Sequence, residues 1–128
     1  MKKLQETIHK YMKARNWDDL PPADIAKSVS IEAAELLEHF QWQNWSKEDI
    51  KKNKEKYEEI KAEIGDIVIY CAEMANILSF DLEIAANNKL KKAAKKYPAH
   101  LFKNNKDPHG TGVYEKIKKE YRKNKFKS

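Results

Sequence analysis

The chain has 128 residues, of which 41% are hydrophobic and 36% are charged, and its net charge is +6. This length suits one domain, and the presence of only three Gly and four Pro favours an all-α fold over a β-rich one. The single cysteine, Cys71, excludes a disulfide framework and a multi-cysteine zinc site. No apolar run approaches the roughly 18 residues of a membrane span, so we expect a cytoplasmic protein with no membrane partner.

The charge is distributed unevenly along the chain. Residues 1–88 hold 12 Lys and Arg against 17 Asp and Glu, a net charge of −5, whereas residues 89–128 hold 14 against 3, a net charge of +11. An acidic body suits cations, and a basic C-terminal segment suits phosphates or nucleic acid. A basic segment is equally compatible with a tail that is merely solvated.

Five helices are predicted from the apolar periodicity and from local start and stop signals. They are expected over residues 2–16, 23–43, 47–78, 82–96 and 113–127, with a loop over residues 103–112. Pro22 suits the first turn of the second helix, Ser46 is the expected N-cap of the third, and Tyr97-Pro98 ends the fourth. The third helix carries a heptad-like apolar seam, which is typical of helices that pack nearly parallel in a bundle.

The second and third helices are apolar over wide faces. The expected core positions are Val29, Ala33, Leu36 and Phe40 on the second helix and Tyr57, Ile60, Ile64, Ile67, Cys71, Met74 and Leu78 on the third. A monomer of this size would cover such faces only in part, so we expect a homodimer or a homotetramer.

Two pairs of carboxylates share one spacing on these helices, Glu32 with Glu35 and Glu63 with Asp66. Residues three apart on a helix lie on one face, with Cβ atoms roughly 5–6 Å apart, so each pair projects two carboxylates to the same side. Acidic groups within apolar segments are unfavourable unless something neutralises them. A hard divalent cation, Mg²⁺ above all, would do so, although the spacing alone is also compatible with ordinary carboxylates at the edge of a core.

At helical spacing, each acidic pair is followed by further residues that can hold a ligand. His39 and Trp42 continue the face of the first pair, and Tyr70 and Glu73 continue the face of the second. Aromatic side chains such as Trp42, and Trp17 in the preceding turn, can stack on a nucleobase or simply pack at the edge of the core. A di-iron site is not expected, because the chain lacks the Glu-x-x-His motif of such bundles.

A combination of short motifs gives the chain a family resemblance. The acidic pairs occur as Glu32-Ala-Ala-Glu35 and Glu63-Ile-Gly-Asp66, followed by Phe40-Gln-Trp42 and by Asp66-Ile-Val-Ile-Tyr70, with Arg15-Asn-Trp17-Asp18 before them and Lys96-Tyr-Pro after them. With these motifs, over about residues 4–102, the chain resembles the all-α, MazG-type nucleoside triphosphate pyrophosphohydrolases, and within them the dCTP pyrophosphatase branch.

The resemblance implies a four-helix bundle core assembled by oligomerisation, with a MazG-like domain over residues 1–102 and a basic extension over residues 103–128. It implies hydrolysis of a (d)NTP between the α and β phosphates to a (d)NMP and pyrophosphate, with dCTP or a modified dCTP as candidate substrates. The cofactor would be Mg²⁺, for which Mn²⁺ can substitute. The metal ligands would be Glu32, Glu35, Glu63 and Asp66, and the nucleotide pocket would contain Trp17, Trp42 and Tyr70.

Further roles are suggested by the chemistry of this reaction. Water must attack a phosphorus atom that anionic oxygens shield, and a carboxylate can take its proton. Glu38, three residues after Glu35, is the candidate general base. Lys89 and Lys96 can supply positive charge to the triphosphate, although a solvated lysine face is an equally good explanation of either residue.

The basic segment also supports an alternative function. A nucleic-acid-binding or scaffold module would bind through residues 103–128 with strong salt dependence. The segment contains few aromatic residues and no groove-reading motif, so we expect a nucleotide substrate rather than a nucleic acid partner.

Overall fold

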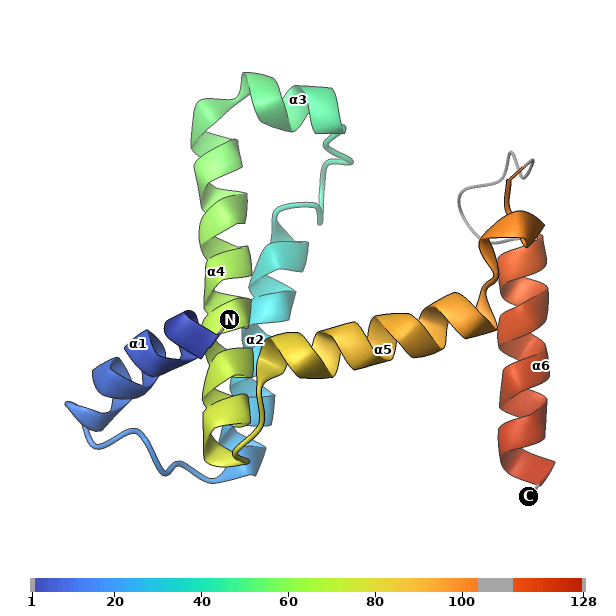
Figure 1. Cartoon of the computed structure of the whole chain (residues 1–128). Helices are drawn as coiled ribbons and strands as arrows, with labels where there is room; N and C mark the ends of the chain where they lie inside the picture. Colours follow the sequence, from blue (N-terminus) through green and yellow to red (C-terminus); the bar gives the residue numbers. More distant parts are fainter. Residues whose placement is uncertain (1, 104–111, 128) are drawn as a thin grey trace. The chain divides into compact units, whose positions relative to one another are not determined.

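The computed structural model describes residues 2–103 and 112–127. The elements are α1 (Lys2–Lys13), α2 (Pro22–Glu38), α3 (Lys47–Lys52), α4 (Lys54–Ile77), α5 (Leu82–Lys96), a 3-10 turn (Ala99–Leu101) and α6 (Val113–Lys127), as Figure 1 shows. The described residues contain no strand, which confirms the all-α prediction, and none of their helices is long and apolar enough to cross a membrane. The predicted loop lies, apart from residues 103 and 112, outside the described residues.

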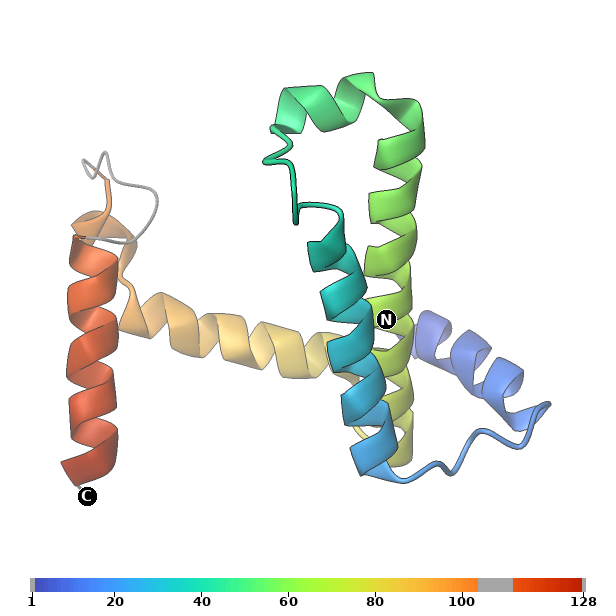
Figure 2. The same cartoon turned by 180° about the vertical axis from the view of Figure 1, so that it is seen from behind.

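The chain divides into two compact units, residues 1–83 and residues 84–128. In the first unit, α2 and α4 lie side by side and run in opposite directions, as both views show (Figure 1 and Figure 2). The helix α1 packs against α4, and α3 leads into the beginning of α4. The helix α4 is therefore the common support of this unit.

A small apolar cluster joins α1 to α4. Ile8 and Met12 are four residues apart on α1, so they share one face, and both are buried against Ala72 of α4. On α2 the buried side chain is that of Ile25, whereas Ala33, expected in the core, is exposed. The buried core of the single chain is therefore smaller than the apolar faces of its helices.

The helix α2 ends at Glu38 and not at residue 43, so the predicted extent was wrong. The backbone N–H groups of residues 39, 40 and 41 donate to carbonyls three residues earlier, which tightens and ends the last turn. The indole Nε1 of Trp45 then donates to the carbonyl of His39 at 3.0 Å. Trp42 consequently lies outside the helix and does not continue its acidic face.

The predicted helix over residues 47–78 is interrupted at Asn53. Ser46 caps α3 as expected, because its hydroxyl accepts a hydrogen bond from the backbone N–H of Asp49 at 3.1 Å. Asn53 has an extended backbone, and its side-chain oxygen accepts from the N–H of Lys56 at 3.0 Å, which makes it the N-cap of α4. An asparagine side chain competes with the helical backbone for hydrogen bonds, and the apolar period does not reveal such a break.

The helix α1 ends at Lys13, earlier than the predicted residue 16. Asn16 has φ 59°, in the left-handed region that asparagine tolerates better than most residues. The N–H of Trp17 donates to the carbonyl of Met12 at 2.9 Å, and the N–H of Asn16 donates to that of Lys13 at 3.1 Å. This pair of bonds is a Schellman motif, and it holds Trp17 against the end of α1.

In the second unit, α5 and α6 have the predicted bounds. The ring of Tyr97 stacks on that of Tyr114 with centroids 4.9 Å apart, and the ammonium of Lys96 lies 4.6 Å from the ring centre of Tyr121. Aromatic stacking and a cation–π contact therefore join the end of α5 to α6. The predicted boundary between a domain over residues 1–102 and an extension stays a prediction.

A buried glutamine fixes α1 to the segment that follows α4. The side-chain nitrogen of Gln5 donates to the side-chain oxygen of Asn76 at 3.1 Å and to the carbonyl of Phe80 at 3.0 Å. The side-chain oxygen of Gln5 accepts from the N–H of Leu82 at 2.8 Å. Because Gln5 is buried, these bonds are needed to satisfy its polar atoms, and they set the position of α1.

Gln5→Leu should lower the free energy of unfolding by about 1–3 kcal/mol, because it leaves the Phe80 carbonyl and the Leu82 N–H without their partner. Urea unfolding followed by circular dichroism measures the change. Gln41→Leu, at an exposed position, is the matched control and should change the free energy of unfolding by less than about 0.5 kcal/mol. Equal effects of the two substitutions would contradict the role of Gln5.

Candidate active site

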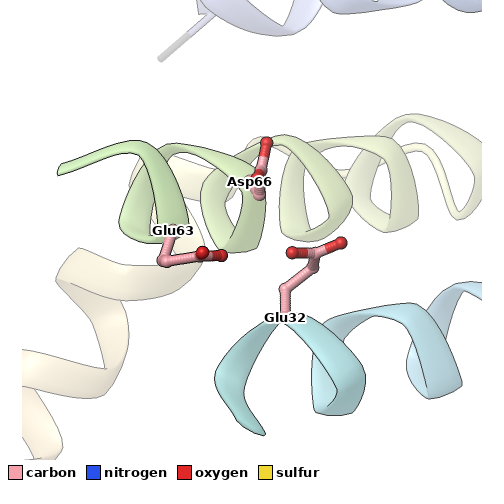
Figure 3. A group of neighbouring side chains, drawn as sticks. All are labelled: Glu32, Glu63 and Asp66. Atoms are coloured by element: carbon pink, nitrogen blue, oxygen red, sulfur yellow. The ribbon is translucent and has the colours of Figure 1, made fainter. Parts of the chain in front are cut away.

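Three carboxylates from α2 and α4 gather where the two helices meet. Glu32 extends from α2 toward α4, on which Glu63 and Asp66 lie one turn apart (Figure 3). One carboxylate oxygen of each residue lies within 4.8 Å of those of the other two. Among the described residues, neither Oε2 of Glu32 nor Oε2 of Glu63 has a hydrogen-bond partner, and both atoms are buried. Unpartnered carboxylate oxygens around a common point form a donor set that fits a hard divalent cation.

The surroundings of Glu32 in this cluster raise the pKa of its carboxyl group. Burial raises the pKa of Glu32 above its usual value, and a hydrogen bond with Glu35 raises it further. The negative charges of Glu35, Asp66 and Glu63 act in the same direction. Glu35 therefore lies beside the cluster, whose three neighbouring carboxylate oxygens belong to Glu32, Glu63 and Asp66. A bound cation would replace this repulsion by attraction, as expected of a metal site.

A pocket of about 690 Å³ opens beside the carboxylate cluster. Glu32 and Asp66 line it, together with the aromatic side chains of Trp17 and Tyr70. Burial raises the pKa of Tyr70, and the negative charges of Glu32, Glu73 and Asp66 raise it further. The phenol therefore keeps its proton at neutral pH and can donate a hydrogen bond to a ligand.

The place of Trp17 in this pocket follows from the end of α1. The Schellman motif fixes its backbone, and its ring meets that of Tyr11 edge to face, with centroids 6.3 Å apart. The guanidinium of Arg15 lies 3.8 Å from the ring centre of Tyr11 on the same turn. Trp17 is 46% exposed, so part of its ring remains available to a ligand.

Glu38 and Trp42 line a different recess, of about 620 Å³, together with Glu35 and Glu63. Glu38 is the last residue of α2 and is exposed, and Trp42 is 86% exposed. Trp42 does not line the pocket that contains Trp17. The structure thus distributes the predicted carboxylates and aromatic residues over two recesses, to each of which the acidic pairs contribute.

Two similarities show the family. The sequence matches the MazG-like family over residues 27–110. The chain belongs to the MazG-like family. Among solved structures, a pyrophosphatase from Archaeoglobus fulgidus is similar, with a TM-score of 0.66 and 33% sequence identity over 77% of this chain and 92% of that chain. No match was found among curated proteins.

These findings confirm the resemblance to MazG-type proteins at the level of the family. The matched region contains all four carboxylates of the two acidic pairs, and both Trp42 and Tyr70. Membership of the dCTP pyrophosphatase branch stays a prediction.

Glu63 of this MazG-like chain lies beside His39, which in turn contacts two residues that the sequence did not single out, Lys56 and Glu59. Nζ of Lys56 lies 3.0 Å from Nδ1 of His39 and 3.0 Å from Oε2 of Glu59. Nε2 of His39 in turn lies 3.6 Å from Oε1 of Glu63. The spacing of Lys56 and Glu59 is visible in the sequence. Their contact with His39 is not, because it depends on where α2 ends.

Lys89 and Lys96 belong to the second unit of the MazG-like chain. They line a recess of about 420 Å³ that also contains Lys92, Lys95 and Tyr121. The recess concentrates positive charge, and the predicted contact of Lys89 and Lys96 with a triphosphate stays a prediction.

Glu73 is a deeply buried carboxyl group in the wall of the 690 Å³ pocket. It is 2% exposed, and neither of its carboxyl oxygens has a hydrogen-bond partner in the described part of the chain. Burial raises the pKa of Glu73 above its usual 4.5. Its contribution to stability is therefore fully present below the pKa of the unfolded chain and is lost as the pH rises through the folded-state pKa.

Glu73→Gln should become more stable than the wild type as the pH rises from about 4.5 to about 8, because only the wild type must ionise a buried group. The difference in the free energy of unfolding, measured with urea at several pH values, should exceed about 0.5 kcal/mol at the upper end. Glu6→Gln, at an exposed position of α1, should show no such trend. A difference that does not vary with pH would contradict the raised pKa.

Proposed function

We propose that this MazG-like chain is a Mg²⁺-dependent nucleoside triphosphate pyrophosphohydrolase, which cleaves the α–β phosphoanhydride bond of a (d)NTP to a (d)NMP and pyrophosphate. The observation that carries the proposal is the gathering of three carboxylate oxygens within 4.8 Å, beside a pocket with aromatic walls. As a member of its family, the chain is a nucleotide pyrophosphohydrolase. The metal and the nucleotide are the finer parts of the proposal.

Glu32, Glu63 and Asp66, with Glu35 beside them, are the proposed ligands of Mg²⁺, which Mn²⁺ can replace. When bound, the cation neutralises charge on the phosphate oxygens and assists the ionisation of the attacking water. Two of these carboxylates also line the pocket of Trp17. A nucleotide with its phosphates at the cluster therefore has its nucleoside in that pocket.

Glu38 is the proposed general base. It lines the same recess as Glu35 and Glu63, and its carboxylate is exposed to solvent, so it can accept the proton of the attacking water. Trp17 and Tyr70 are the proposed walls of the nucleoside site. The indole offers a stacking surface, and the protonated phenol offers a hydrogen bond.

Three more residues are proposed to bind the substrate. Trp42 offers an exposed ring in the recess that contains Glu38, and Lys89 and Lys96 would balance the charge of the triphosphate. The proposed substrate is dCTP or a modified dCTP, and the proposed location is the cytoplasm, which contains the nucleotide pool.

The apolar faces of α2 and α4 support assembly into a homodimer or a homotetramer. Leu37 on α2, Ile64 on α4 and Leu78 at its end are exposed in the single chain. Burial of one such side chain is worth about 1.5–3 kcal/mol, so a second copy that covers these faces would stabilise the fold.

Multi-angle light scattering should give twice or four times the 15.0 kDa mass of one chain at micromolar concentration. The mass should be independent of salt if apolar contacts hold the subunits, because ionic screening acts on charges. A mass of 15.0 kDa would contradict the assembly.

Incubation with Mg²⁺ and a panel of nucleoside triphosphates should give monophosphate and pyrophosphate, separated by ion-exchange chromatography, and EDTA should stop the reaction. Glu63→Gln should lower kcat by about 100-fold or more, because it removes a charge at the reacting phosphates, while the circular dichroism spectrum stays unchanged. Glu58→Gln, at an exposed position of α4, is the control and should retain activity. Full activity of Glu63→Gln, or release of orthophosphate as the product, would refute the proposal.

A further inference from the structure

Glu73 is a buried carboxyl group for which the proposed reaction has no use. The two aliphatic hydroxyl groups that line the same pocket are each already engaged on their own helix. Thr7 donates to the carbonyl of Lys3 at 3.0 Å, and Ser28 donates to that of Asp24 at 3.0 Å. Glu73 thus stays unpartnered among the described residues, and a buried polar group of this kind calls for an explanation.

The position of Glu73 relative to the carboxylate cluster points to a ligand. Glu73 follows Asp66 by seven residues on α4, which is two helical turns on one face, or roughly 10 Å along the axis. Tyr70 lies between them, and all three residues line one pocket. The distance matches the reach of a nucleotide from its α-phosphate to the far edge of its base. If the proposed function holds, Glu73 meets that edge.

We propose that Glu73 selects the base, by pairing its carboxyl group with the amino group and the adjacent ring nitrogen of cytosine or adenine. The carbonyl oxygen of the acid accepts from the amino group, and its O–H donates to the ring nitrogen. Both oxygens of Glu73 are then satisfied by one ligand. Burial favours the protonated acid, which this pairing uses.

Uracil and hypoxanthine are the matched bases that lack this pairing. Each has a carbonyl group in place of the amino group and an N–H in place of the basic ring nitrogen. An acid that donates to a basic nitrogen can share its proton, and such charge-assisted hydrogen bonds are about twice as strong as neutral ones. A carbonyl oxygen does not take up the proton in this way. The pocket should therefore prefer the amino base of each pair.

The test compares dCTP with dUTP, and dATP with dITP, on the wild type, Glu73→Gln and Glu73→Ala. For at least one of these two pairs, the wild type should have a higher kcat/KM for the amino base than for the keto base. Both substitutions should lower this ratio of the two kcat/KM values by about tenfold or more. Glu58→Gln on the exposed side of α4 is the control, and its ratio should equal that of the wild type. An unchanged ratio in both Glu73 variants, or a wild-type preference for the keto bases, would overturn the inference.

A binding measurement separates this inference from the proposed function on which it rests. Calorimetric titration with dCMP, dUMP, dAMP and dIMP requires no hydrolysis. A preference for an amino base that is lost in Glu73→Gln supports base selection even if no triphosphate is cleaved, in which case the proposed function fails. Cleavage with equal selectivity in the wild type and in both variants refutes base selection and leaves the proposed function intact.

Discussion

The antiparallel contact between α2 and α4 is the constraint on which the site depends. It holds Glu32 of one helix against Glu63 and Asp66 of the other, so like charges are forced together at a helix contact. The burial of Ile8 and Met12 on α4 stabilises the unit around this repulsion. The fold therefore keeps a cluster that is unfavourable by itself, and the same repulsion gives the cluster its attraction for a cation.

The carboxylates and the two tryptophans of the site lie on different kinds of element. All the carboxylates of the site lie on α2 or α4, whose backbones are fixed by their own hydrogen bonds. Trp17 and Trp42 lie on the segments that follow α1 and α2. The helices thus place the charge before a ligand arrives, as preorganised electrostatics require, while local turns hold the two tryptophans.

The sequence was sufficient to predict features that depend on local spacing. The acidic pairs, the bounds of α5 and α6, and the capping role of Ser46 each follow from a few neighbouring residues. The C-terminal end of α2 and the break at Asn53 were not predicted, because a few local hydrogen bonds decide them and the apolar period continues through both. The burial of Glu73 without a hydrogen-bond partner among the described residues was also not predicted, since it depends on α1 packing onto α4 from a distant part of the sequence.

The wall of the 690 Å³ pocket is formed partly by residues inside the family match and partly by α1, which precedes it. The match to the MazG-like family begins at residue 27, so the carboxylate cluster lies inside the matched region and α1 lies before it. Five residues of α1 nevertheless line the pocket, namely Leu4, Thr7, Ile8, Tyr11 and Met12. The carboxylate cluster and part of the pocket wall therefore belong to stretches of chain that can diverge separately. An exchanged N-terminal helix would present a new surface to the ligand and leave the inherited carboxylates untouched.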